Sequence, residues 1–240
     1  MKDISNLALF VVLCFVLLPV FISCRQKLGL GKDILLSSIR AFIQLLILGF
    51  LISYIFSFNN PFAIIGYIFL MAIIASLNIS QKGQHFQKTF LIVFLSIALS
   101  VSIPLILCLL FSIVPFDAQH LIPLGGMFSG AAMVTCAVIL EAMAKGMQTE
   151  ETEMRKSAVK IAMVPTVESL KTMGLVQMPG TMTGMILAGV DPLKAVKYQI
   201  FIVFTLLIVS AVSAILLSHF NYRTFYYSRK EKPSARSVNE

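Results

Sequence analysis

Apolar residues occupy long runs of this chain, and short polar segments separate one run from the next. A hydrocarbon core about 30 Å thick needs about 20 mostly apolar residues per crossing helix. Runs of that length predict about seven membrane-spanning helices, at residues 4–24, 35–57, 61–80, 89–114, 121–144, 172–190 and 198–219. The sixth is the least regular of them, because it contains four glycines and a proline.

The composition agrees with this pattern. Hydrophobic residues make up 58% of the 240 residues, charged residues only 12%, and the mean hydropathy is +0.91. Soluble domains contain about 25% charged residues. We therefore expect an all-α integral membrane protein surrounded by the lipid bilayer, with a polytopic domain at residues 1–226 and a basic, disordered tail at residues 227–240.

Basic residues orient the chain, because lysine and arginine accumulate in short cytoplasmic loops. If the N-terminus lies outside, all Lys and Arg residues face the cytoplasm except Lys2, Lys194, Lys197 and the intramembrane Arg40. This distribution predicts an external N-terminus and a cytoplasmic C-terminus in the inner or plasma membrane. The net charge of +8 then reflects orientation and anionic headgroups, so we expect no nucleic-acid partner.

One long polar segment, residues 145–171, predicts an additional helix. Thr149 can cap it, and acidic residues precede basic ones along it, which suits the helix dipole. One face of this helix is apolar and consists of Met154, Ala158, Ile161 and Ala162. Such a weakly amphipathic helix either lies on the lipid headgroups or docks on a partner.

The chain contains no motif for bond-making chemistry. It lacks a GxxxxGK[ST] phosphate loop, an HExxH pair and a GxSxG turn, and its three histidines are scattered. We therefore expect no enzyme and no resident metal or cofactor. Asp117 and His120 could attract a cation, but two residues make no site. Four methionines, Met173, Met178, Met182 and Met185, indicate either core packing or a path for a soft metal.

Arg40 lies within the second predicted span, with Gln44 one turn later. An arginine inside a span costs about 2.5–3.5 kcal/mol on insertion scales unless its head group reaches water or faces a cavity. Arg40 is close enough to the cytoplasmic end to reach the headgroups. The alternative is that Arg40 and Gln44 form a polar stripe along a transport path or against a second subunit.

The sixth predicted span should be broken around residues 175–180. Pro179 lacks an amide donor and clashes with the preceding turn, and Gly180 frees the next backbone position. Unwound backbone at membrane depth is tolerated only beside protein or water. We therefore predict a gate in a transport path there, formed by Gln177, Met178, Pro179, Gly180, Thr181, Met182, Thr183 and Gly184.

Two stretches are more specific than the apolar helices around them. MVPTVESLKTMGLVQMPGTMTGMILAGVDPLKAVKYQI, residues 163–200, closely resembles the C-terminal core of the FetB-like iron-export ABC permease family. KLGLGKDILLSSIRAFIQLLILGF, residues 27–50, is similar to that family's second helix, with its Arg-x-x-x-Gln-Leu pattern. The resemblance extends from about Lys27 to Ile202 and includes plant aluminium-tolerance permeases.

The resemblance implies a permease that forms a homodimer and pairs with a separate cytoplasmic ABC ATPase, which binds ATP and Mg. EAMAKG, residues 141–146, resembles the Glu-Ala…Gly element through which permeases contact their ATPase. The residues expected to couple the chain to the ATPase are Glu141, Ala142, Gly146, Arg155 and Lys156. A helix that simply ends at Gly146 is the alternative reading of this short motif.

The implied function is export of iron or another metal-related substrate with energy from the ATPase. Three alternatives remain open at this point. The chain could be an ABC permease for a nucleotide sugar or another small solute, an ion-coupled secondary carrier, or a membrane scaffold without transport activity. Flux that depends on ATP rather than on an ion gradient separates the ABC permease from the carrier, and absence of flux favours the scaffold.

The predicted orientation can be tested with single cysteines in a cysteine-free variant. In intact cells, cysteines at Asn60 and Gln119 should react with a membrane-impermeant thiol reagent, because both loops face outward. Cysteines at Gln84 and Gln148 should react only after the cells are opened. The reverse labelling pattern would overturn the orientation.

Overall fold

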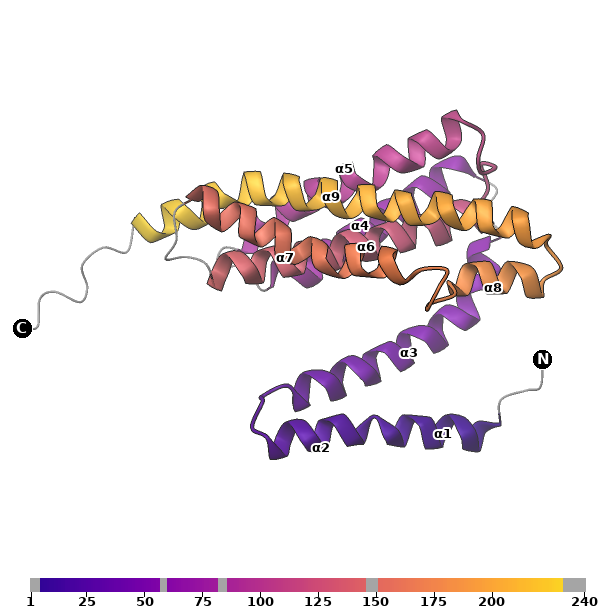
Figure 1. Cartoon of the computed structure of the whole chain (residues 1–240), viewed down its shortest axis with the longest axis horizontal. Helices are drawn as coiled ribbons and strands as arrows, with labels where there is room; N and C mark the ends of the chain where they lie inside the picture. The colour runs from indigo at the N-terminus through magenta and orange to yellow at the C-terminus, as the bar shows by residue number, and fades with distance from the viewer. Residues whose placement is uncertain (1–4, 57–59, 82–85, 146–150, 231–240) are drawn as a thin grey trace, which may run out of the picture. The chain divides into compact units, whose positions relative to one another are not determined.

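A computed structural model describes residues 5–56, 60–81, 86–145 and 151–230, and within these residues the chain is almost entirely helical (Figure 1). The contacts divide the chain into two compact units, Met1–Phe58 and Asn59–Glu240. Nine helices, α1 to α9, occur in the described ranges. The prediction of an all-α protein is confirmed.

The first unit is a helical hairpin. Helix α1 (Asn6–Phe15) is followed after one residue by α2 (Leu17–Arg25), and α3 (Gly31–Phe56) returns beside them (Figure 1). The turn before α3 needs left-handed backbone at Lys27 (φ 53°) and Gly29 (φ 74°). At Gly31 the helices approach so closely that a Cβ would lie 3.0 Å from the Cys24 sulfur. The hairpin accounts for the predicted spans 4–24 and 35–57.

The second unit is a bundle formed by α4 (Pro61–Ser80), α5 (Phe86–Leu110), α6 (Ala118–Lys145), α7 (Glu151–Thr172), α8 (Gly180–Leu187) and α9 (Pro192–Lys230). Two residues define the start of α4. The Asn60 side chain caps the helix by accepting from the Phe62 amide at 2.9 Å, and Pro61 occupies the first turn. Helices α5, α6, α7 and α8 all contact α9. Figure 1 shows α9 running along the length of this bundle.

The core of the bundle combines apolar side chains with small hydroxyl residues. Val93, Ile97, Phe128, Ile139 and Leu217 are almost completely buried. Several buried serines bond to carbonyls of their own helix, such as Ser76 to Ala72 at 2.7 Å and Ser213 to Ser210 at 3.0 Å. These serines therefore pack as small residues without an unpaired hydroxyl, which lets the helices approach closely.

Six of the described helices are long and apolar enough to cross a membrane: Leu7–Arg25, Gly31–Phe56, Pro61–Ser80, Phe86–Leu110, Ala118–Lys145 and Pro192–Phe220. They correspond to six of the predicted spans. Residues 172–190 differ, because they consist of the last residue of α7, a loop and the short helix α8. The described helices there are too short to form a sixth continuous span, and the predicted break around residues 175–180 is confirmed.

Helix α7 packs against the bundle through one face and leaves its other face exposed. It contacts α6 and α9, and the side chains of Met154, Ala158 and Ala162 on its apolar face are at most 7% exposed. Ile161, which the sequence placed on the same face, is half exposed. The sequence predicted that this helix lies on the lipid headgroups or docks on a partner. Its apolar face instead packs against α6 and α9 of the same chain.

The C-terminal end of the bundle is also longer than predicted. Helix α9 continues to Lys230, so residues 227–230 of the predicted disordered tail are helical. Residues 231–240 lie outside the described residues.

Close contact between α4 and α6 generates a stability prediction. A Cβ at Gly125 would lie 2.9 Å from Cγ1 of Ile68, whereas a Cβ at Gly66 would meet nothing within 4 Å. Gly125→Leu should destabilise the bundle by about 1–3 kcal/mol through overpacking. Gly66→Leu, the matched control on α4, should leave it unchanged. The measurement is the midpoint of thermal aggregation of the purified protein in detergent, and equal midpoints for the two variants would contradict this packing.

Candidate functional site

The chain is unwound between α7 and α8, over residues 173–179. Gly174 adopts a left-handed conformation (φ 84°), and its amide donates to the Gln177 carbonyl at 3.0 Å. The Thr172 carbonyl accepts from the amides of residues 175, 176 and 177 at 2.9 to 3.3 Å. Pro179 then precedes α8 with extended backbone (ψ 137°). Gly174 and Pro179 thus make a compact, hydrogen-bonded break that replaces a continuous helix.

A cavity of about 320 Å³ lies between α6, α7 and α9, next to this break. Four hydroxyl groups line it, from Thr135 of α6, Thr166 and Ser169 of α7, and Ser210 of α9. The remaining lining residues are apolar or small and include Pro165, Leu170 and Met173. No charged side chain lines the cavity. The cavity is therefore an open, mostly apolar groove with a few hydrogen-bonding groups.

The cavity lies near the middle of two candidate membrane spans. On α6 it is lined by residues between Gly130 and Thr135, within the span Ala118–Lys145, and on α9 by residues between Val203 and Ser210, within Pro192–Phe220. Transport sites in membrane proteins are commonly found near the bilayer midplane beside interrupted helices. The cavity and the broken α7–α8 segment share both properties.

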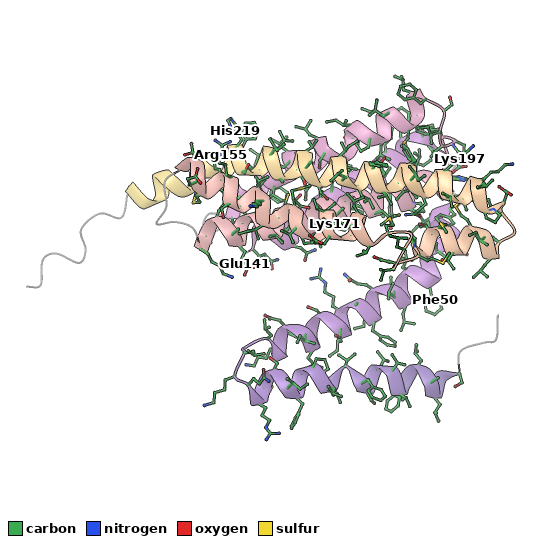
Figure 2. The ribbon with its side chains drawn as sticks, viewed as in Figure 1. Phe50, Glu141, Arg155, Lys171, Lys197 and His219 are labelled. Carbon is green, nitrogen blue, oxygen red and sulfur yellow. The ribbon has the colours of Figure 1, made fainter. Side chains whose placement is uncertain are left out.

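Two side-chain contacts join α7 to α9, one at the cavity and one nearer the end of the bundle. The Thr166 hydroxyl donates to the Ser210 hydroxyl at 3.4 Å, and Arg155 Nη2 donates to Nδ1 of His219 at 3.1 Å. Because the later residue of α7 meets the earlier residue of α9, the two helices are antiparallel. In Figure 2, Arg155 and His219 lie at one end of the bundle, Lys197 at the other, and Lys171 between them.

Helix α8 is attached to α9 by one polar contact. The Thr181 hydroxyl bonds to the side-chain carbonyl of Gln199, which is only 7% exposed. The Thr183 hydroxyl instead donates to the carbonyl of Pro179 in its own first turn, at 3.2 Å. A Cβ at Gly180 or Gly184 would meet no atom within 4 Å, so the small-residue face of α8 is open in a single chain.

None of the predicted gate residues lines the cavity. Gln177, Met178 and Pro179 belong to the break itself, Thr181 fastens α8 to α9, and Met182 is half-buried. Arg40 and Gln44 are exposed on α3 of the first unit. Sequence reasoning missed the four cavity hydroxyls; the spacing of Thr166 and Ser169 after a proline inside a helix was the signal that could have indicated them.

The residues predicted to couple the chain to an ATPase are partly brought together. Glu141 and Ala142 lie in the last turns of α6, where Glu141 pairs with Lys145 at 2.8 Å. Lys156 pairs with Glu153 at 3.0 Å near the start of α7. Arg155 is directed along α9 to His219, which is exposed, and the Arg155 Nε is buried without a partner among the described residues. Gly146 lies outside the described residues.

An ion pair is exposed on α7 at the level of the cavity, so Lys171, which was predicted to face the cytoplasm, lies instead at the depth of the spans of α6 and α9. Glu168 and Lys171 pair at 2.7 Å, and their side chains are 59% and 63% exposed. They are sequence neighbours of Ser169 and Leu170, which line the cavity from the same helix turn.

Asp117 and His120 pair with each other at the start of α6. The Asp117 carboxylate accepts from the His120 amide at 2.8 Å and lies 2.7 Å from the ring Nδ1. Slight burial raises the pKa of Asp117, but the hydrogen bonds and charge of His120 outweigh it, so the pKa is lower than usual. The described residues contain no group of three or more His, Cys, Asp or Glu side chains placed to hold a metal.

Comparison with known proteins assigns the chain to a family. Residues 6–156 and 150–226 match the family model described as "Uncharacterised protein family (UPF0014)". The chain is 33% identical to "Probable iron export permease protein FetB" of Escherichia coli K12 over 95% of each protein. It is 35% identical to "UPF0014 membrane protein YjkA" of Bacillus subtilis, over 92% of this chain and 95% of that protein.

A plant protein is similar as well: "Protein ALUMINUM SENSITIVE 3" of Arabidopsis thaliana is 31% identical, over 89% of this chain and 85% of that protein. No solved structure matches the chain significantly. The resemblance drawn from residues 27–50 and 163–200 is thus confirmed over most of the chain. The chain is a multi-pass membrane protein that belongs to the UPF0014 family.

Proposed function

We propose that this chain is the permease subunit of an ABC exporter in the plasma membrane, with a transport path along helix α7 and the α7–α8 break. The observation that carries the proposal is the Glu168–Lys171 ion pair, which is exposed at the depth of the cavity between α6, α7 and α9. The name of the Escherichia coli relative, "Probable iron export permease protein FetB", supports the direction and the cargo.

The energetic cost of placing charges in lipid argues against a lipid-facing position for the Glu168–Lys171 pair. A Glu or Lys at the centre of a lipid-exposed helix costs about 2.5–3.5 kcal/mol on insertion scales. An exposed ion pair stabilises a protein by at most about 1 kcal/mol, which does not offset this cost. The outer face of α7 must therefore face water or another protein surface, since lipid cannot solvate it. A water-filled path, closed on its far side by a second copy, meets this requirement.

A second copy also fits the open surfaces of α8. Gly180 and Gly184 have no neighbours within the chain, and Leu175 and Val176 of the adjoining break are 91% and 83% exposed. Small residues four apart permit close helix approach in membranes, and two-fold closure is the commonest way to pair identical chains. In this proposal the homodimer places the two α7 helices around one path.

Energy for transport would come from a separate ATPase. The sequence has no phosphate loop of its own, so ATP and Mg would bind to the partner. The α6 end with Glu141 and the first turns of α7 lie at one end of the bundle, where closure of an ATPase pair could push on α7 (Figure 2). Movement of α7 against α6 and α9 would open and close the cavity between them.

An ion-coupled carrier is the second candidate, because a carboxylate at membrane depth such as Glu168 is also typical of coupling-ion sites. Reconstituted flux separates the two. The proposed exporter moves Fe(II) only when its ATPase and ATP are present, whereas a carrier responds to an imposed ion gradient.

The first test concerns the partner. The purified chain should neither bind nor hydrolyse ATP, and Glu141→Lys or Gly146→Leu should weaken its association with the ATPase about tenfold, a loss of about 1.4 kcal/mol, through charge reversal or crowding at the contact. Pull-down of the ATPase and its stimulated hydrolysis are the measurements. Lys194→Glu, a charge reversal at the opposite end of α9, is the control. Unchanged stimulation in both variants would contradict the assignment of residues 141–146.

The second test concerns the gate. Thr181→Val removes the contact between α8 and Gln199, and losing a buried hydrogen bond of about 1 kcal/mol should lower ATP-dependent Fe(II) flux about fivefold. Thr183→Val has the same shape change but loses only a bond within α8, so its flux should stay near normal. Flux into inverted vesicles is measured beside expression and ATPase association. Equal flux in the two variants would show that the α8–α9 contact is not part of the gate.

A further inference from the structure

Arg155 of α7 and His219 of α9 converge near one end of the bundle, although 64 residues separate them in the sequence. Arg155 Nη2 lies 3.1 Å from Nδ1 of His219. A guanidinium stays protonated and has no lone pair to offer, so Nδ1 must accept and the ring proton is assigned to Nε2. The remaining polar groups of the two side chains, on the guanidinium and at Nε2, are therefore all hydrogen-bond donors.

The positive charge of Arg155 is not compensated by the described side chains. Arg155 takes part in none of the ion pairs formed among the described residues, whereas its neighbour Lys156 pairs with Glu153 at 3.0 Å. The imidazole that Arg155 contacts is neutral, and the Arg155 side chain is half-buried, so water screens its charge only in part. A contact with only donors left over and an excess positive charge favours an anionic acceptor.

The contact lies at the level of the lipid headgroups. His219 is next to the last residue of the candidate span Pro192–Phe220. The stretch of α9 from Lys197 to His219 is about 33 Å long at about 1.5 Å per residue, close to the hydrocarbon core of about 30 Å. Figure 2 shows Lys197 and His219 at opposite ends of the bundle. His219 therefore marks one boundary between hydrocarbon and headgroups.

An apolar stripe on α9 leads from His219 toward the middle of the membrane. Residues three or four apart lie on one face of a helix. On the face of His219 these residues are Ile215, Val212, Ile208 and Phe204. Ile215 and Phe204 are 58% and 57% exposed. A lipid acyl chain can lie along this stripe while its headgroup reaches the contact, whereas a soluble anion or a carboxylate of another protein would leave the stripe unused.

We propose that Arg155 and His219 bind the phosphate of an anionic phospholipid, with one acyl chain along the stripe on α9. The remaining guanidinium N–H groups of Arg155 and the Nε2–H of His219 donate to the phosphate oxygens, and the phosphate compensates the charge of Arg155. Bonds between arginine and phosphate are strong, and basic pockets between membrane helices bind anionic headgroups. The lipid joins α7 to α9 at the end of the bundle opposite to α8. This inference goes beyond the proposed function, because lipid binding requires neither an ATPase nor cargo.

Native mass spectrometry, which counts the lipids that stay bound to a purified membrane protein, tests the proposal. The full chain in detergent is titrated with phosphatidylglycerol or with zwitterionic phosphatidylcholine. Wild type should bind one phosphatidylglycerol per chain about tenfold more tightly than phosphatidylcholine, and Arg155→Gln should lose this preference. Arg155→Lys should weaken binding about threefold, because an ammonium keeps the charge but not the planar fork of donors. Lys156→Gln, the matched control one residue away, should bind like wild type.

A second variant keeps the test valid if Arg155→Gln does not fold. His219→Phe retains a ring and leaves Arg155 in place, but removes the Nε2 donor, so it should weaken phosphatidylglycerol binding about threefold. The midpoint of thermal aggregation without added lipid is measured on each variant. Lipid binding is compared only among variants whose midpoint matches that of wild type.

Three results would overturn the lipid site. Equal phosphatidylglycerol affinity in wild type and Arg155→Gln, or an equal loss in Lys156→Gln, would show that surface charge alone attracts the lipid. Displacement of bound phosphatidylglycerol by excess inorganic phosphate would show a site for free anions. Weaker association of Arg155→Gln with the ATPase at unchanged lipid affinity would make the contact a protein-docking surface. The expected association of this variant is that of wild type, so failure of the lipid site is distinguished from failure of the proposed function.

Discussion

Helix α7 imposes the main physical constraint on this structure, because it is a polar helix packed among apolar ones. The inner face of α7 packs on its apolar neighbours through the small side chains of Ala158 and Ala162. The Thr166 hydroxyl on this face donates to the Ser210 hydroxyl of α9. The outer face of α7 keeps the charges and pairs them along the helix. The helix can therefore contact α6 and α9 closely, but only if its opposite face is not left to lipid.

The break after α7 follows from the same constraint. A continuous helix over residues 151–187 would span far more than a bilayer thickness at about 1.5 Å per residue. The loop at 173–179 shortens the return across the bundle and satisfies most of its backbone internally, through Gly174 and the Thr172 carbonyl.

Helix α9 connects the other parts of the bundle to one another. It contacts four other helices, and its buried polar side chains either bond to their own helix, as Ser213 does, or reach a neighbour, as Gln199 reaches Thr181. Neutral contacts of this kind are worth only about 1 kcal/mol each, so apolar packing contributes most of the attachment of α7 to α9.

The amino-acid sequence by itself determined the features that depend on local composition. Apolar runs of sufficient length defined six spans to within a few residues at most ends, and Pro179 with Gly180 located the helix break, because a missing amide and a missing side chain act wherever the helix lies. Motifs at residues 27–50 and 163–200 were enough to identify the family. Only the tertiary structure decided where α7 lies, because its apolar face is too weak to distinguish lipid headgroups from a neighbouring helix. It also decided that Arg155 bonds to His219, 64 residues away, and that hydroxyls from three helices line one cavity. Such contacts depend on which helices pack together, and side-chain periodicity along one helix carries no information about its partner.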